Sequence, residues 1–497
     1  MSQPGLGVKI NGNSEYSKPT TPFHAASYQL PVVLVLVFQD QKARWRRMHH
    51  LCDLPNEILF PILYKHPDLL NLCLVSKKLL SRAQGLFYSE FLCYKAKETW
   101  TIRAFLRTII RQPRLALHVR KLVLISWRAY NRQSDEWDDT DYDSERKYST
   151  AQNLSDRKLF QRAIKELALP DKQFWRSAFR KDIDEVYVAL LILLLPNLRT
   201  LQMLAPSEPE VLAKALYYAT ILQTSTSSVR SLQRLEHVHY GVRGNTTSGD
   251  VTFLAPCFRI PSVSVVHNGG LSVSGLKVWP RQPESSYVKQ LTLQYAAIEP
   301  SILQEILRST EHLEIFSYKH WDQFRSNPSR FDPPSFTEAL RVVAHSLKDL
   351  EINYDKITRC PHRQTLGSLG GFTQLQNLKT PLKLLIGSPT HASVDLVNML
   401  PQSIETLSFT DIDDEFFICH CTRIVAQLTQ LMEGRAAYTP LLKRVSARLW
   451  QKDRSRQDRN AFRGLVDAAE AAGVELGDAF GEGAHQQRTL LRREDWI

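Results

Sequence analysis

A short pattern of apolar and polar positions recurs along the chain from residue 198 onward. In each copy an apolar residue is followed by a second three positions later and by a third two positions beyond that. The second and third residues lie on one face of a β-strand, so each copy predicts a half-buried strand. The clear copies are Leu198/Leu201/Met203, Val288/Leu291/Leu293, Leu313/Phe316/Tyr318, Leu347/Leu350/Ile352 and Ile404/Leu407/Phe409. Residues 232–238 and 375–378 hold poorer copies.

Stretches with helical spacing alternate with these strands. In residues 301–309, Ile302, Leu303, Ile306 and Leu307 fall on one helical face. Residues 335–347, 393–400, 415–432 and 461–476 are similar. The central apolar residues of the later copies fall at 291, 316, 350, 378, 407 and 445, with gaps of 25, 34, 28, 29 and 38 residues. The pattern resembles leucine-rich repeats, whose units have about 20–29 residues.

This resemblance predicts an α/β fold over residues 161–480, namely an irregular leucine-rich-repeat-like solenoid with a parallel inner sheet. Two insertions interrupt the pattern. Residues 131–160 predict an acidic loop, because Asp135–Glu145 is rich in carboxylates but lacks the central glycine and final glutamate of a calcium loop. The range Gly241–Pro283 predicts short strands and a surface loop. Residues 481–497 form a C-terminal tail.

The stretch from Leu54 to Tyr88 is apolar but divided into short segments. Pro55 suits the first position of a helix, and Ile58 and Leu59 begin a helical apolar pattern. Asp68 can cap a second short helix and Ser76 a third. Three such helices in so little chain are not stable alone. They pack either inside a larger core or against a partner protein.

These residues also resemble an F-box, on Leu54, Pro55, Glu57, Ile58, Leu59, Ile62, Leu63, Asp68, Leu69, Leu72, Val75, Ser76 and Lys77. The resemblance implies a small all-helical F-box at residues 48–92. It also implies two partners, the Skp-type adaptor of Skp/cullin/F-box ubiquitin ligases and, through it, a cullin. The residues that would bind the adaptor are Leu54, Pro55, Ile58, Leu59, Ile62, Leu63, Leu69, Leu72, Val75 and Leu79. Residues 105–124 are similar to the segment after the F-box in many fungal F-box proteins, so 93–130 predicts a linker helix and first strand.

Residues 1–47 predict a disordered extension, because the first 29 are polar and rich in Ser, Pro, Gly and Thr. The apolar run Leu30–Phe38 has nine residues, whereas a membrane span needs about 20. We therefore expect no membrane partner. Met48 is an alternative start, since nothing upstream is needed by the segment that follows.

The charge and cysteine content fit an intracellular binding protein. The formal net charge is +12, but the 63 basic residues are scattered, so a nucleic-acid partner is not favoured. The seven cysteines are odd in number and widely spaced, which predicts reduced thiols and a cytoplasmic or nuclear location. Cys419 and Cys421 lack a second pair with the spacing of a zinc site.

No motif predicts catalysis. The chain lacks a phosphate-binding loop ending in Gly-Lys-Ser/Thr and a Gly-x-Ser-x-Gly nucleophile elbow. His49, His50, His237, His239 and His420 form no triad or metal set by sequence. We therefore predict a non-enzymatic protein with no cofactor, no catalytic residues and no metal ligands.

The predicted function is substrate recognition in ubiquitin-dependent degradation, with the F-box holding the adaptor and the solenoid holding a target protein. The residues expected to contact the target are Tyr295, Lys319, Glu351 and Asn353, which lie between or beside core positions of the inner strands. The alternative is a non-catalytic scaffold or nucleic-acid-associated protein that uses its F-box outside a ubiquitin ligase.

Overall fold

A computed structural model of the chain describes residues 83–93, 99–125, 150–180, 184–205, 209–224, 231–242, 253–270, 272–273, 286–321, 331–354, 364–387, 394–410, 414–447 and 456–477. All of them belong to one compact unit, Ala83–Ile497. The ten residues predicted to bind the adaptor, from Leu54 to Leu79, lie outside the described residues.

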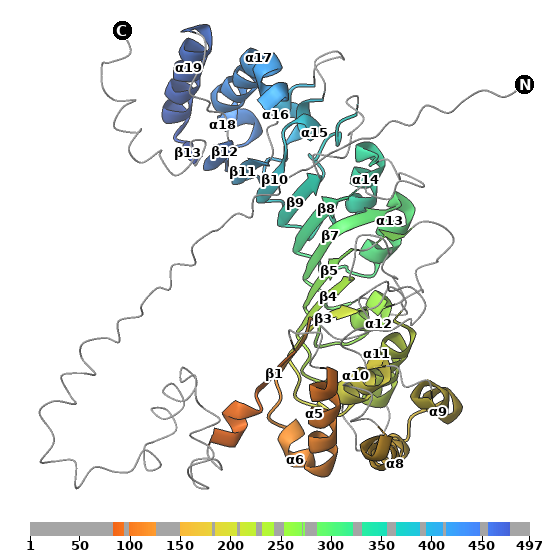
Figure 1. Cartoon of the computed structure of the whole chain (residues 1–497). Helices are drawn as coiled ribbons and strands as arrows, with labels where there is room; N and C mark the ends of the chain where they lie inside the picture. Colours follow the sequence, from red (N-terminus) through yellow and green to blue (C-terminus); the bar gives the residue numbers. More distant parts are fainter. Residues whose placement is uncertain are drawn as a thin grey trace, which may run out of the picture. The chain divides into compact units, whose positions relative to one another are not determined.

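A single parallel sheet runs through this unit (Figure 1). Its thirteen described strands follow one another in chain order, except that β6 pairs with the far end of β7. The strands are β1 (Glu90–Cys93), β2 (Lys121–Leu124), β3 (Thr200–Ala205), β4 (His237–Val242), β5 (Val265–Gly269), β6 (Ser272–Val273), β7 (Gln290–Ile298), β8 (Ile315–His320), β9 (Asp349–Tyr354), β10 (Asn377–Pro381), β11 (Thr406–Thr410), β12 (Arg444–Ala447) and β13 (Glu475–Gly477). The predicted α/β array with a parallel sheet is confirmed.

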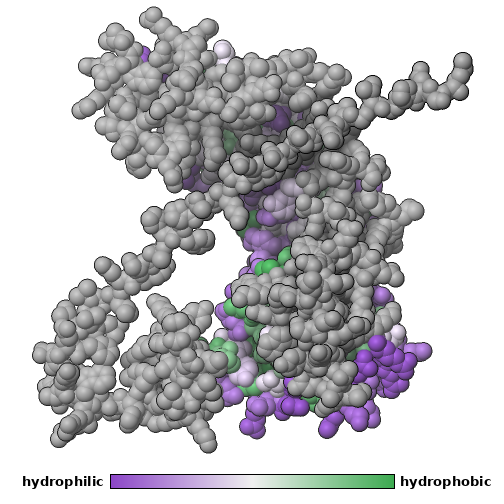
Figure 2. Space-filling model, in the orientation of Figure 1, coloured by the Kyte–Doolittle hydropathy of each residue, from purple (hydrophilic) through white to green (hydrophobic). Residues whose placement is uncertain are grey.

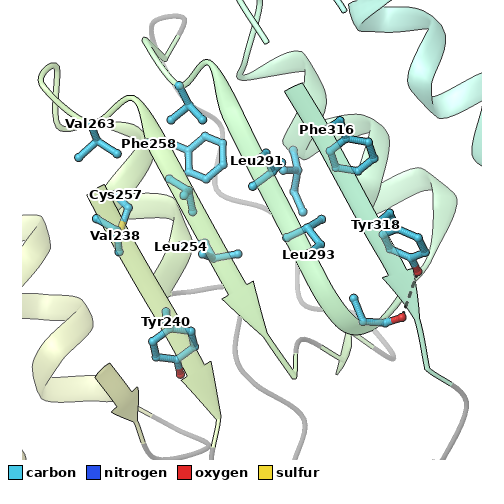
Figure 3. Packing of buried hydrophobic residues seen from close by; sticks show 14 of the residues in the cluster. Val238, Tyr240, Leu254, Cys257, Phe258, Val263, Leu291, Leu293, Phe316 and Tyr318 are labelled. Atoms are coloured by element: carbon cyan, nitrogen blue, oxygen red, sulfur yellow. Dashed lines mark hydrogen bonds between the residues drawn. The ribbon is translucent and has the colours of Figure 1, made fainter. Parts of the chain in front are cut away.

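Two columns of aligned side chains form the core side of the sheet. The first column includes Leu201, Leu291, Phe316, Leu350 and Leu407, which occupy equivalent register positions and are buried. The second column lies two residues further along each strand. Figure 3 shows its members Tyr240 on β4, and Leu293 and Tyr318 on the adjacent strands β7 and β8. The spacing read from the sequence therefore identifies the core positions.

The helices pack on the core side of the sheet (Figure 1). In α13, Ile302, Leu303, Ile306 and Leu307 are buried, and Pro300 occupies the helix start, where its missing N–H costs nothing. The helices are α5 (Thr99–Arg111), α6 (Pro113–Ala116), α8 (Thr150–Glu166), α9 (Lys172–Arg180), α10 (Asp184–Leu193), α11 (Glu210–Thr224), α12 (Leu254–Phe258), α13 (Pro300–Arg308), α14 (Pro333–Leu340), α15 (Lys383–Ile386), α16 (Leu396–Met399), α17 (Asp414–Glu433), α18 (Arg435–Tyr438) and α19 (Arg456–Ala472).

Helix α10 is apolar on every side, because a second helical layer covers it. Residues 186–193 are at most 3% exposed. α10 packs against α5, α9 and α11, and α8 packs against α5 and α9. A helix that is hydrophobic all round is stable in water only in such a position.

The turn before each strand follows one backbone pattern. The carbonyl oxygen of Glu314 accepts hydrogen bonds from the N–H groups of Lys348 (2.8 Å) and Asp349 (3.0 Å). The carbonyl of Glu405 does the same for Lys443 (2.8 Å) and Arg444 (3.1 Å). Six residues separate helix from strand in the connections from 193 to 200, 258 to 265, 308 to 315 and 399 to 406. These turns therefore fix the spacing between neighbouring strands.

Three predicted boundaries shift. The sheet begins at Glu90, inside the range 48–92 assigned to the F-box and one strand before the expected first strand at Leu122 and Leu124. Helix α8 begins at Thr150, inside the range 131–160 expected to be a loop. The range Gly241–Pro283, expected to be an insertion, contributes α12 and β5, which form a regular repeat of the array.

The two described cysteines outside α17, Cys93 and Cys257, are buried. Among the helices within the described ranges, none combines the length and apolar character that a membrane span requires.

Candidate functional site on the outer face of the sheet

The sheet face opposite the helices is the candidate site, and we call it the outer face. Its side chains alternate with the core columns, as in β8, where Ser317 and Lys319 alternate with buried Phe316 and Tyr318. The same alternation places Glu351 and Asn353 on the outer face of β9. Three of the four residues predicted to contact a target therefore share this face, on adjacent strands.

Tyr295 reaches the surface through a backbone irregularity. Strict alternation from buried Leu293 would turn Tyr295 into the core, but a bulge interrupts the pairing of β7 with β8 between Leu293 and Ala296. Tyr295 has φ +53°, which is unusual for a bulky residue, and its side chain is 40% exposed. Strained conformations of this kind cluster at binding and catalytic sites.

The exposed Tyr295 ring has a cation above it and a second aromatic ring at its side. The Lys319 ammonium lies 4.7 Å from the centre of the Tyr295 ring. The Trp321 ring meets it edge-on, with the two ring centres 4.9 Å apart. Aromatic rings held in this way present a large, rigid contact area, as residues that dominate protein interfaces do. We call Tyr295, Lys319 and Trp321 the aromatic corner.

A buried polar network supports the bulge from the core side. The Tyr318 hydroxyl donates to the carbonyl oxygen of Ala296, 3.1 Å away (Figure 3), and lies 3.1 Å from Nδ1 of His320. Burial lowers the pKa of His320 to about 4 and raises the pKa of Tyr318. Both groups are therefore neutral at pH 7, and the network fixes the Ala296 backbone next to Tyr295.

Carboxylates on β9 are tied to neighbouring strands. Glu351 accepts a hydrogen bond from Ser317 Oγ at 3.0 Å and pairs with Lys379 Nζ at 2.7 Å. Asp349 accepts a hydrogen bond from the Asn377 amide at 2.5 Å. Glu351 is therefore already engaged across three strands, which makes it a positioned acceptor rather than an isolated charge.

Histidines gather on the outer face of β4 and β5. The rings of His239 and His267 stack with their centres 4.5 Å apart and their planes 8° apart. Burial is the main cause that lowers the pKa of both rings, that of His239 to about 4, and electrostatic repulsion from neighbouring basic groups adds to it. Sequence reasoning missed this pair, because only the register of β4 with β5 brings the two rings together.

A separate basic surface lies on the outer helical layer. Helices α8 and α9 expose Lys158, Lys165, Lys172, Arg176 and Arg180, and Figure 2 shows this region as strongly hydrophilic. The exposed carboxylate Glu166 pairs with Arg162 on the same helix. We call this region the basic helix surface.

The described residues show no arrangement suited to catalysis by an activated thiol or a metal. Burial raises the pKa of the Cys257 thiol to about 12, so it is not a thiolate at neutral pH. In these residues no three His, Cys, Asp or Glu side chains lie close enough to hold a metal ion. The geometry of the outer face is instead that of a binding surface.

Comparison with known families agrees with this geometry. A family model described as a leucine-rich repeat domain matches residues 95–474. Comparison with curated proteins gave no match for this sequence. The family match spans more than half of the 497 residues and contains β2 to β12 and the helices from α5 to α19. The chain belongs to the leucine-rich repeat family.

Proposed function

We propose that the protein is the substrate-recognition subunit of a Skp/cullin/F-box type ubiquitin ligase. Its leucine-rich repeat domain supports a role in protein–protein interaction and is of a kind that is typically non-catalytic. In the proposal, the outer face holds a target protein and the F-box-like segment holds the Skp adaptor. Ubiquitin transfer then follows from the high effective concentration of the tethered target.

The observation that carries the target-binding half is the aromatic corner. Tyr295 is held exposed by a strained backbone, Lys319 lies over its ring and Trp321 flanks it. Holding a strained, exposed aromatic residue costs stability, and that cost is explained if the ring makes contacts in a complex.

The adaptor-binding half is supported by the position of the F-box-like residues. They end at Lys77 or Leu79, and the sheet begins at Glu90. The adaptor-binding segment would thus directly precede the target-binding array in the chain. This arrangement suits a protein that links two partners.

The outer face does not favour a nucleic acid as the partner. On β9 and β10 its charges alternate in sign, with Asp349 and Glu351 beside Lys379. Nucleic-acid binding requires a continuous positive surface along the phosphate backbone. The basic helix surface is the part of the described chain that could support the alternative, so it serves below as a control.

Adaptor binding is tested by a matched pair of substitutions. Leu72→Asp places a charge among apolar contacts, which costs about 3 kcal/mol or more, and should abolish co-purification with a Skp adaptor. Asn71→Asp adds the same charge one residue away, at a position outside the apolar pattern, and should retain it. If both variants melt at the wild-type temperature and recover the adaptor equally well, the F-box assignment is wrong.

Target binding is tested by proximity labelling in cells with the proteasome blocked. The variant Tyr295→Ala/Lys319→Ala/Glu351→Lys should lose proteins that the wild type labels, and keep the adaptor. The control Tyr287→Ala/Arg308→Ala/Glu305→Lys makes the same changes at exposed positions away from the outer face. If both variants retain the labelled targets, the outer face is not the target site.

A further inference from the structure

The outer face changes its charge along the sheet. From β2 to β8, the described outer positions carry no Asp or Glu side chain. They carry Lys121, His237, His239, His267 and Lys319. Carboxylates appear at the strands on either side, with Glu90 on β1 in register with Lys121, and Asp349 and Glu351 on β9. This half of the face is therefore complementary to an acidic ligand.

Two glycines lie side by side on the outer face beside the histidines, and the Leu204 side chain covers the first of them, since a Cβ added at Gly241 would lie 2.6 Å from Leu204 Cδ2. Gly241 and Gly269 are paired in the register of β4 and β5, between Leu204 on β3 and Gln294 on β7. A Cβ added at Gly269 would meet only the Gly241 Cα, at 3.9 Å, so the space above Gly269 is open. Glycine in a strand allows the backbone of a ligand to approach closely. We call this pair the glycine shelf.

We propose that the outer face from β2 to β8 binds an extended acidic segment of a target protein, which crosses the strands over the glycine shelf and the stacked imidazoles. The inference rests on the proposed function and specifies that the bound segment of the target protein is acidic. Five steps between strands separate Lys121 from Lys319, and Lys319 lies four residues beyond Ile315, the β8 residue in the row of Lys121. At roughly 4.8 Å per step and about 3.3 Å per residue, the span is about 27 Å. A segment of about eight extended residues covers that span. Its carboxylates would meet a lysine at each end and imidazole N–H groups between them.

Binding of such a segment takes up protons. The charged groups around the stacked rings are Lys121 on β2 and His237 on β4, with the pair Arg199–Glu236 at the strand starts. The flanking residues Gln202 and Thr292 are neutral. Carboxylates beside the rings offset their burial and the repulsion from Lys121, which favours the imidazolium form. Affinity should therefore rise as pH falls.

Fluorescence anisotropy of the full-length chain with labelled octaglutamate tests the proposal. We expect saturable binding that is at least threefold tighter at pH 5.5 than at pH 7.5. Octalysine should not bind. His239→Gln/His267→Gln should remove the pH dependence. Gly269→Val should weaken binding at least tenfold by filling the space above Gly269, and its melting temperature should not fall, because an added Cβ meets no atom closer than 3.9 Å.

The control variant is Lys172→Ala/Arg176→Ala, on the basic helix surface. It removes two positive charges elsewhere and should bind octaglutamate as the wild type does. Loss of binding in this variant, with retention in Gly269→Val and the histidine variant, would overturn the proposal and place acidic ligands on the helices. Equal competition by a single-stranded oligonucleotide would also overturn it.

Failure of this inference is distinguishable from failure of the proposed function. Octaglutamate binding does not require the F-box, so it is measured without the adaptor. If octaglutamate fails to bind while Leu72→Asp abolishes adaptor binding and the aromatic-corner variant loses its targets, the acidic-segment proposal is wrong and the proposed function stands.

Discussion

The Arg107 guanidinium donates hydrogen bonds from two of its nitrogens to the two carboxylate oxygens of Asp156, and this contact links α8 to α5. The Arg107 Nε lies 2.8 Å from Asp156 Oδ1, and Nη2 bonds the other oxygen. The Asp156 side chain is 11% exposed. The hydrogen bonds that Arg107 donates to Asp156 are the main cause that raises the pKa of Arg107. Asp156, which lies in the range 131–160 that the sequence predicted to be an acidic loop, thus links two helices.

Removing this link should loosen the outer helical layer. Asp156→Ala should lower the free energy of unfolding by roughly 1–3 kcal/mol, because Arg107 loses a bidentate partner in a partly buried position. Chemical denaturation followed by circular dichroism measures the change. The control Glu166→Gln removes an exposed pair with Arg162 and should change stability by less than about 0.5 kcal/mol. Similar effects of the two substitutions would contradict the prediction.

Glu185 should make stability depend on pH near neutrality. Its carboxylate accepts the Leu212 N–H at 2.9 Å, at the start of α11. Burial raises the pKa of Glu185 from 4.5 to about 7, against the opposing effect of the Leu212 and Val211 N–H groups. The folded state therefore holds more protons than the unfolded state between these values, and stability falls as pH rises through this window.

The substitution Glu185→Gln keeps an acceptor and removes the titration. Relative to wild type, it should be more stable at pH 8 by up to roughly 3 kcal/mol, and similar at pH 4.5. Thermal melting of both proteins from pH 4.5 to 8 measures the difference. A constant difference across that range would show that Glu185 does not titrate there.

Asn268 occupies a core position, and an apolar residue in its place should make the protein more stable. It lies in register between Tyr240 and Leu293 and is 1% exposed. Among the described residues, neither its amide nitrogen nor its amide oxygen has a hydrogen-bond partner. Asn268→Leu should therefore raise the free energy of unfolding by about 1–2 kcal/mol. Gln294→Leu, at an exposed position one strand away, should raise it far less; the reverse order would refute this reading.

The positive φ of Tyr295 predicts that glycine and alanine at this position differ in their effect on stability but not in their effect on target binding. Tyr295→Gly relieves the backbone strain, whereas Tyr295→Ala keeps it, so the glycine variant should be more stable than the alanine variant by about 1 kcal/mol. Both variants should lose target binding equally, because both lack the ring over which Lys319 lies. Melting temperatures and labelling yields check the two parts separately.

The core of the array could be predicted because apolar side chains must recur at strand spacing. Leu350 and Ile352 illustrate this, since both are buried and stand at the second and third positions of the pattern. Strand β5 was expected only as one of the short strands of an insertion, and its place as a regular repeat of the array was missed for the same reason. Asn268 takes the third position, so the pattern of Val263 and Val266 is incomplete in a glycine- and serine-rich stretch.

The outer face was only partly predictable. Lys319, Glu351 and Asn353 follow from alternation alone. The exposure of Tyr295 depends on a bulge, and its neighbours include neither a glycine nor an asparagine that would signal positive φ. Trp321 joins it through packing beyond the end of β8. The pairing of His239 with His267 depends on register, which single-sequence periodicity does not contain.

The turns in which one carbonyl accepts two N–H groups lie at the starts of the strands. The length of the connection is therefore more restricted before a strand than after it. Four of the connections from helix to strand have the same length of six residues, whereas those from strand to helix range from one residue, between Ile298 and Pro300, to twelve, between His320 and Pro333. Hydrogen bonds in the preceding turn thus hold each strand start against the neighbouring strand, whereas residues can be inserted after each strand end. The protein can acquire or lose surface segments next to Lys319 and Asn353 without re-registering its core, so its recognition properties can evolve independently of its fold.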